Sequence, residues 1–308
     1  MRDMGNLRAA PCAAFGLALL ASGAGCARRE PSSAALSASA TVASSAPEPA
    51  ASAPVVSPIP QELVDRTLNP NHLPVYDGPT GSVEGTILVT GPASPDNHVE
   101  AHSCPAAIDI YGKLFREGTP GTPGGPRPLA DAIVIAVGYG GYYLAEKNPV
   151  KSINISVNCG YPERSIAMTY GQRIEVANAS KYPFAPMIDT DPSPAVMMAA
   201  PLGAGDPIRL YPRRPGHSVM GDLMQTYVRE DLYVLRHPLH AVSGLDGHYR
   251  IDGVPVGKMS VAAQHPTVNS QAQAQVSIEA GVVQRVDLTL EYSPKAPQPT
   301  DKHDLILR

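Results

Sequence analysis

Short runs of apolar and β-branched residues recur along most of this chain, and several alternate apolar with polar positions. No segment shows a long apolar repeat of 3.6 residues. Alternation with period two is typical of a strand with one buried face, and the 27 Gly and 33 Pro supply turns between strands. Many short strands predict an all-β protein built as a β-sandwich. The runs are residues 82–89, 132–137, 152–157, 173–176, 232–235, 248–251, 259–263, 274–278 and 286–290.

The N-terminal pattern differs from the rest. A basic start is followed by an apolar run at 13–20 and by the small residues 21–25. This order predicts a secretory signal over residues 1–25, because the run is too short to span a bilayer as a stable helix. Cys26 directly after it resembles the lipidated cysteine of the bacterial lipoprotein lipobox, although Gly23 stands where that motif usually has Leu. The resemblance implies lipid attachment at Cys26. The alternative is ordinary cleavage beside an unmodified cysteine.

The segment after Cys26 has little apolar bulk. Residues 31–60 contain 9 Ala, 8 Ser and 6 Pro with one charged residue. Because such a composition cannot pack a core, we expect a disordered tether over residues 26–75. Signal, lipid and tether together predict a protein anchored at the cell envelope, with the membrane as a partner. The absence of Asp at Ala27 favours the outer membrane, facing the periplasm or the exterior, by resemblance to known lipoproteins.

The most specific local pattern lies near the C-terminus. Asp246-Gly247 opens a D-G-x-[FY]-x-[IL] strand, and Pro255 and Gly257 follow in a [VL]-P-x-G turn. This order resembles the carboxypeptidase regulatory-like, or transthyretin-like, β-sandwich. Asp246-Gly247 is expected to form a tight hairpin turn. The family's modules are mostly accessory, and some relatives in the broader carbohydrate-binding-like class bind sugars.

That resemblance also implies boundaries. It predicts a carboxypeptidase regulatory-like region over residues 237–294, with its opening strand near 82–90. Residues 295–308 follow as a flexible tail.

The middle of the chain resembles a second fold. Residues 130–236 resemble a cupredoxin-like insertion of exported bacterial proteins. The matching elements are Cys159-Gly160-Tyr161-Pro162, a strand at 171–178 that ends in Asn, and a Pro-Gly turn at 214–217. The resemblance assigns residues 76–236 to a cupredoxin-like β-sandwich.

The copper ligands of that family have no counterpart here. A blue-copper site needs two imidazoles and a thiolate, with a weak axial thioether. The positions where the family places its ligands carry Phe184, Gly221, Met224 and Tyr227. We therefore expect no type-1 copper and no other cofactor.

Cysteine parity bears on the remaining thiols. Cys12 leaves with the signal, so the mature chain holds an odd number of cysteines. If Cys26 carries lipid, Cys104 and Cys159 remain as one pair in an oxidising compartment. The same two residues resemble the cysteine pair in relatives of this domain arrangement, which implies a disulfide. The alternative is two buried free thiols.

Other chemistry is sparse. The net charge of −4 argues against a nucleic-acid partner, and no nucleotide-binding or hydrolase motif occurs. His237 and His240 could form a metal pair, but two histidines on either side of a Pro at this spacing do not share one face of a strand. Four methionines could form a soft copper site, but Met is also a common gap-filling core residue. The methionines are Met197, Met198, Met220 and Met224.

The sequence thus predicts a non-catalytic, envelope-anchored lipoprotein with a binding or structural role. A first alternative is a carbohydrate-binding surface module, with a glycan or an envelope protein as its partner. The chain has no Trp, so its 13 Tyr would have to form an exposed cluster on a sheet face or loop rim. A second alternative is a metal or redox carrier with an altered site, which predicts convergent His and Met side chains.

Overall fold

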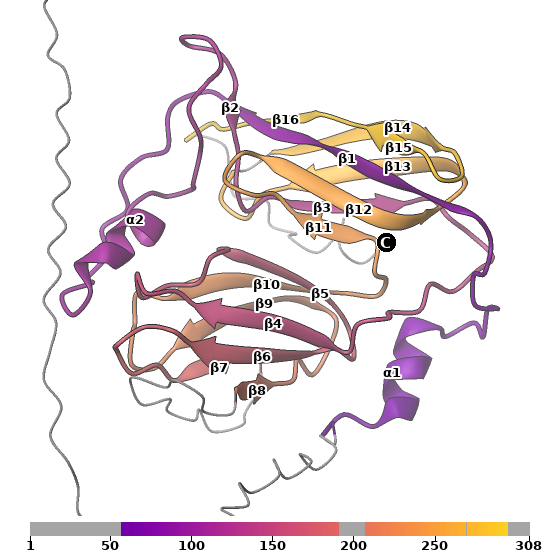
Figure 1. Cartoon of the computed structure of the whole chain (residues 1–308), viewed down its shortest axis with the longest axis horizontal. Helices are drawn as coiled ribbons and strands as arrows, with labels where there is room; N and C mark the ends of the chain where they lie inside the picture. Colours follow the sequence, from indigo (N-terminus) through magenta and orange to yellow (C-terminus); the bar gives the residue numbers. More distant parts are fainter. Residues whose placement is uncertain (1–56, 191–206, 269, 295–308) are drawn as a thin grey trace, which may run out of the picture. The chain divides into compact units, whose positions relative to one another are not determined.

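The computed structural model describes residues 57–190, 207–268 and 270–294. The predicted signal, Cys26, most of the predicted tether and the C-terminal tail lie outside these residues. Nearly all regular structure in the described part is strand (Figure 1), so the predicted all-β sandwich fold is confirmed. The described residues all belong to one compact unit, in which we distinguish a first sandwich, made of β1–β3 and β11–β16, from a second, made of β4–β10.

β1 (Thr80–Thr90) is the central strand of one sheet of the first sandwich. It pairs antiparallel with β12 and β2, and parallel with β15 and β16. Every second residue from Gly81 to Val89 is buried, as the period-two alternation predicted. The strand expected near 82–90 therefore pairs with three strands from the far end of the chain and with β2. Its partners are β2 (Arg127–Pro128), β12 (His248–Pro255), β15 (Val283–Arg285) and β16 (Leu288–Glu291).

The facing sheet completes the first core. Its strand order is β11-β3-β13-β14, with all neighbours antiparallel. Val83 and Ile87 of β1 belong to the same buried cluster as Val134 and Val261 of this sheet. The strands are β11 (His240–Val242), β3 (Ile133–Val137), β13 (Gly257–Gln264) and β14 (Gln271–Ile278).

The Asp246-Gly247 turn joins these two sheets. It connects β11 of one sheet to β12 of the other. The expected tight turn is present, because the N–H of Gly247 donates to the carbonyl of Gly244 and the N–H of Gly244 donates to the carbonyl of His248, but the strands on either side of it pair in different sheets. Gly247 has a φ of +74°, and a Cβ at this position would lie 2.4 Å from the carbonyl oxygen of Ile87. Both the backbone conformation and the close approach therefore require glycine.

β3 corrects the predicted boundary between the two regions. It lies inside the range 76–236 assigned to the cupredoxin-like part, yet it pairs with β11 and β13 of the first sandwich. One face of β3 packs in the first core through Val134, while Ile133 packs against Tyr233 of the second sandwich. A strand that is buried on both faces has a continuous apolar sequence. Such a sequence does not indicate to which sheet the strand belongs.

The second sandwich contains a four-stranded and a three-stranded sheet. The strand orders are β5-β10-β9-β7 and β4-β6-β8. The pairs β5–β10 and β4–β6 are parallel, whereas the remaining pairs are antiparallel. The strands are β4 (Val150–Ile155), β5 (Ser165–Thr169), β6 (Arg173–Asn178), β7 (Pro186–Ile188), β8 (Ile208–Leu210), β9 (Gly216–Asp222) and β10 (Arg229–Leu235).

A helix corrects the predicted tether. Residues 57–75 are not disordered throughout, because α1 (Gln61–Leu68) forms after Pro60. Ile59 and Val64 are buried in the core of the second sandwich, and the site of a Cβ on Gly171 would lie 2.6 Å from Val64. Tertiary packing of these two side chains thus orders a segment that composition alone places in the tether. No helix of the described part is long and apolar enough to span a membrane.

The connection between β1 and β2 links the two sandwiches. It carries the one-turn helix η1 (Pro105–Ala107) followed by α2 (Ile108–Tyr111). Its Cys104 is bonded to Cys159 of the second sandwich, and the Tyr111 hydroxyl donates a hydrogen bond to Glu230 of β10. A loop of the first sandwich is therefore fastened to the second by a covalent bond and by a buried hydrogen bond.

Candidate ligand-binding site

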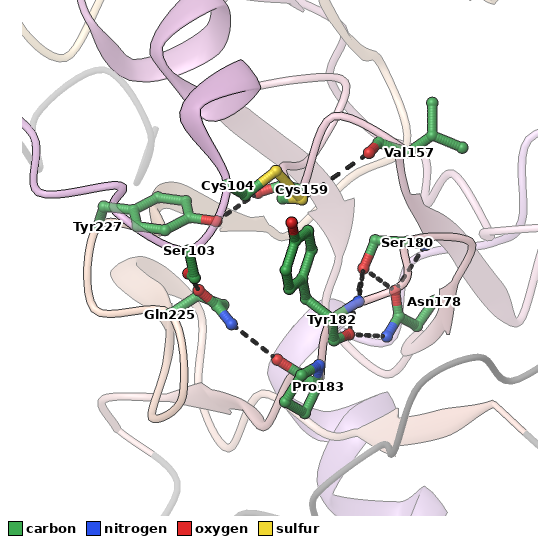
Figure 2. The surroundings of a disulfide bond; sticks show 10 residues. All are labelled: Ser103, Cys104, Val157, Cys159, Asn178, Ser180, Tyr182, Pro183, Gln225 and Tyr227. Atoms are coloured by element: carbon green, nitrogen blue, oxygen red, sulfur yellow. Dashed lines mark hydrogen bonds between the residues drawn. A yellow bond between two sulfur atoms is a disulfide. The ribbon is translucent and has the colours of Figure 1, made fainter.

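The predicted disulfide between Cys104 and Cys159 is present. The two Cα atoms lie 6.4 Å apart, within the usual range for a bridge, and both residues are buried. Tyr227 donates a hydrogen bond from its hydroxyl to the carbonyl of Cys159 (Figure 2). The bridge therefore lies beside the loop where the cupredoxin-like resemblance places its metal ligands.

The residues at the expected copper positions do not form a ligand set. Phe184 is fully buried in the second core, whereas the Met224 side chain is 47 % exposed. Gly221 lies within β9, paired with Arg229. Within residues 57–190, 207–268 and 270–294, no group of three His, Cys, Asp or Glu side chains could hold a metal ion.

Polar side chains hold the loops at this end of the second sandwich. The Asp222 carboxylate accepts hydrogen bonds from the backbone N–H groups of Ala185, Met224 and Gln225, at 2.7–2.8 Å. Burial raises the pKa of Asp222. Gln225 donates to the carbonyl of Pro183 and accepts from the hydroxyl of Ser103, as Figure 2 shows. The Asp222 oxygens thus accept from backbone N–H groups, and the Gln225 amide oxygen accepts from a hydroxyl group.

Asn178 has a similar role on the neighbouring loop. Its side-chain oxygen accepts hydrogen bonds from the backbone N–H and hydroxyl of Ser180, and its amide nitrogen donates to the carbonyl of Tyr182 (Figure 2). Asn178, which the resemblance placed at the strand end, therefore stabilises the loop that follows it through hydrogen bonds.

The two candidate histidines have separate partners. His237 accepts a hydrogen bond at Nδ1 from the N–H of Leu239, and burial lowers its pKa to about 4. His240 lies with Nε2 3.3 Å from the hydroxyl of Thr169, and burial lowers its pKa to about 3. Of the candidate methionines, Met220 is buried in the second core and Met224 is exposed. Met197 and Met198 lie outside the described residues.

A cavity with a volume of about 500 Å³ lies elsewhere. Four separate segments line it, at residues 75–80, 144–147, 238–239 and 252–253. Tyr76 supplies an aromatic ring, and Leu144 and Leu239 supply apolar surface. A cavity of this size with an apolar wall and a few polar groups is the usual form of a small-ligand site. Its polar lining side chains are Asp77, Thr80, Glu146, Lys147 and Asp252.

Tyr76 is held rigidly at this cavity. Its hydroxyl donates a 2.6 Å hydrogen bond to the carbonyl of Pro79. The site of a Cβ on Gly78 would lie 2.7 Å from the Tyr76 ring, so the ring packs directly onto the glycine backbone. Tyr142 lies beside it in a T-shaped arrangement, with ring centroids 5.2 Å apart and planes at 73°.

Backbone pairing positions the two aromatic segments against each other. The N–H of Tyr76 donates to the carbonyl of Tyr143, and the N–H of Tyr143 donates to the carbonyl of Pro74, both at 2.9 Å. Tyr142 stays 48 % exposed beside them. One exposed tyrosine, Tyr142, thus lies beside the half-buried Tyr76, and an exposed tyrosine cluster for carbohydrate binding stays a prediction.

Glu146 lies at the boundary with a smaller cavity of about 230 Å³. Its two carboxylate oxygens accept hydrogen bonds from the N–H of Asn148 and from the hydroxyl of Thr169. Both donors are neutral, so they fix the side chain without cancelling its charge. His240, Lys151 and Glu163 are among the residues that line the smaller cavity.

Sequence reasoning did not find the larger cavity. Its polar residues are spread over more than 170 positions, from Asp77 to Asp252, with no motif spacing. The local signals were the Tyr76-Asp77-Gly78-Pro79 turn and the Tyr- and Gly-rich stretch at 138–143. A tyrosine in a Gly-Pro turn indicates a ring held at a surface, yet it does not say which segment faces it.

The chain matches no protein family and no curated protein in sequence. In structure it is similar to a copper-containing nitrite reductase of Thermus scotoductus (15 % identity, 32 % of this chain and 24 % of that one, TM-score 0.23). A minor pilin of Streptococcus agalactiae aligns at 12 % identity over 72 % of this chain and 48 % of that one, with a TM-score of 0.25.

A third similar structure is a Pseudomonas aeruginosa protein provisionally described as carbohydrate-binding. It aligns at 11 % identity over 76 % of this chain and 99 % of that one, with a TM-score of 0.24. The alignments thus span about a quarter and about half of the first two proteins. Because all three TM-scores are below 0.5, the description of the fold rests on the strand pairing itself.

Proposed function

We propose that this protein is a non-catalytic carbohydrate-binding module, anchored by lipid at Cys26 to the cell envelope. The observation that carries the proposal is the Tyr76 ring, held by Pro79, Gly78 and Tyr142 in the lining of a cavity of about 500 Å³. Sugar rings present a C–H face that stacks on an aromatic ring and a rim of hydroxyls that needs polar partners. Tyr76 and the polar lining residues offer both.

Rigidity of the platform favours binding. A side chain fixed before the ligand arrives loses little conformational entropy on binding, so more of the contact energy appears as affinity. Tyr76 is fixed through its hydroxyl, through the contact of its ring with Gly78 and by the neighbouring ring of Tyr142. The side chains of Asp77 and Lys147 are exposed and free to adjust to different hydroxyl patterns.

The carboxylates of the cavity are placed for binding rather than for glycoside cleavage. A glycosidase needs one carboxyl group that keeps a proton, usually by burial in an apolar pocket, and a second that stays ionised. Asp77 and Asp252 are exposed. Glu146 is half-buried, and its two oxygens accept hydrogen bonds from the N–H of Asn148 and the hydroxyl of Thr169. This arrangement supports a binding role.

The test is titration calorimetry of the mature protein with neutral oligosaccharides chosen from a glycan array. Tyr76→Ala is expected to weaken the strongest interaction at least tenfold, about 1.4 kcal/mol. Leu245→Ala, at a residue 63 % exposed and not part of the cavity, is the matched surface control and should leave binding unchanged. Equal affinity of the Tyr76 variant and the wild type, or the absence of any glycan ligand, would contradict the proposal.

A further inference from the structure

The ionisable side chains that line the Tyr76 cavity are mostly acidic. Asp77, Glu146 and Asp252 face a single cation, Lys147. A full set of charges gives three negative and one positive, a net of −2. A cavity lined by one sign of charge attracts ligands of the other sign and repels ligands of the same sign.

Asp77 and Glu146 make no ion pair within the described part of the chain, whereas Asp252 is paired with Arg250. Asp77 is exposed and makes no hydrogen bond or ion pair within the described part of the chain. Asp252 uses one oxygen, Oδ1, to accept from Ser82 and from Arg250. Arg250 also forms an ion pair with Glu84, with 2.8 Å between Nη1 and Oε2, so one guanidinium group pairs with the carboxylates of both Asp252 and Glu84. Glu146 is held by neutral donors alone.

We infer that the cavity prefers glycans whose sugars carry a free amino group, such as glucosamine units, over N-acetylated and acidic glycans. The inference rests on the proposed function, since Tyr76 must first hold a sugar ring. A protonated amine on that ring supplies three donors and one positive charge, which the exposed carboxylates can accept. A uronic acid in the same position would meet the carboxylates with like charge.

The expected preference is moderate and depends on salt. Asp77 and Asp252 are exposed, so water and ions screen their attraction to a ligand. We expect a glucosamine tetramer to bind about three- to tenfold more tightly than the N-acetylglucosamine tetramer at low ionic strength. At about 0.5 M salt the ratio should approach one, because the screening length falls to a few ångströms.

The experiment is calorimetry on the mature protein with three tetramers, of glucosamine, N-acetylglucosamine and galacturonic acid. The variant Asp77→Asn with Asp252→Asn should bring the ratio of the affinities for the glucosamine and N-acetylglucosamine tetramers to about one, whatever happens to either affinity alone. The control, Asp109→Asn with Glu291→Gln, removes the same charge from exposed positions outside the cavity and should keep the preference. Thermal unfolding of each variant checks that the fold is retained.

The outcomes separate this inference from the proposed function. Equal affinity for the amino and N-acetylated tetramers, with binding still lost in Tyr76→Ala, would overturn the charge preference and leave carbohydrate binding intact. Spermidine that competes as strongly as the glucosamine tetramer would also overturn it, because charge without a sugar would then suffice. If the wild-type protein binds none of the three tetramers, both the charge preference and the proposed carbohydrate binding are overturned.

Discussion

The hydroxyl of Tyr111 donates a hydrogen bond to the carboxyl group of Glu230, and it accepts one from the N–H of Tyr161. Tyr111 belongs to the connection between β1 and β2, whereas Glu230 lies on β10, so this contact fastens the first sandwich to the second. Glu230 is fully buried, and its Oε2 has no hydrogen-bond partner in the described part of the chain. Burial raises the pKa of Glu230 to about 8 and raises the pKa of Tyr111 as well.

This raised pKa predicts that stability falls as the pH rises. In the unfolded chain Glu230 loses its proton near pH 4.5, whereas in the folded chain it keeps the proton up to about pH 8. Between these values the folded state binds more protons, so the free energy of unfolding decreases by about 1.4 kcal/mol per pH unit. Glu230→Gln should remove this slope between pH 6.5 and 8, as measured by urea denaturation. The control is Glu279→Gln, at an exposed position, which should keep the wild-type slope. If the free energy of unfolding depends on pH in the same way in Glu230→Gln and in the wild type, Glu230 is ionised in the folded protein.

Buried histidines predict the opposite dependence at lower pH. His265 accepts backbone hydrogen bonds at Nδ1 from Thr267 and Val268, and burial lowers its pKa to about 4. As the pH falls from 6.5 towards 4, the unfolded chain takes up a proton that the folded chain refuses. The free energy of unfolding therefore falls by about 1.4 kcal/mol per pH unit for this histidine.

His265→Asn should reduce this acid sensitivity, because the Asn oxygen can accept from the same N–H groups without titrating. The measurement is urea denaturation at pH 5 and pH 7. His248→Asn, at an exposed position, should keep the wild-type difference between the two pH values. If the free energy of unfolding differs between pH 5 and pH 7 by the same amount in the His265 variant as in the wild type, His265 does not cause the acid sensitivity.

The disulfide should contribute substantially to stability. Cys104 and Cys159 close a loop with a sequence separation of 55, for which chain entropy gives about 4 kcal/mol. Cys104→Ala with Cys159→Ala should lower the free energy of unfolding by roughly that amount. Denaturation of the wild type with and without reductant is the matched comparison. Two free thiols titrated in unfolded, non-reduced protein would contradict the bridge.

Lipid attachment at Cys26 is expected to hold the protein on a membrane. Cys26→Ser should move it to the soluble fraction, because two acyl chains anchor stably where none remain in the variant. Cys12→Ser, inside the predicted signal, should leave membrane association unchanged. Mass spectrometry that finds an unmodified mature N-terminus at another residue would rule lipidation out.

Purified protein should show no intense blue colour after incubation with Cu(II). That colour comes from charge transfer between Cu(II) and a cysteine thiolate, and both Cys104 and Cys159 are held in the disulfide. Phe184 and Gly221 at the expected ligand positions supply neither an imidazole nor a thiolate. Visible absorption of the copper-loaded protein checks this, and a strong blue band would refute it. Copper bound without that band would revive the altered-site carrier.

The features that could be predicted from the sequence are the local ones. The alternation in residues 82–89 predicted a half-buried strand, and β1 has that pattern, because side chains alternate between the faces of any strand. The pairing of Cys104 with Cys159 came from parity and from the resemblance. The placement of Phe184, Gly221 and Met224 at the ligand positions of copper-binding proteins came from the resemblance alone and stays a prediction.

Tertiary structure alone decided the rest. Burial of Val64 ordered a helix inside the predicted tether, and packing on both faces assigned Ile133–Val137 to the first sandwich. The candidate site depends on Tyr76 meeting Tyr142 and on Asp77 lying in one cavity with Asp252. Backbone periodicity is a property of neighbouring residues and can be predicted from sequence. A cavity arises where strand register and turn geometry bring distant segments together, and those are set by the packing of the whole chain.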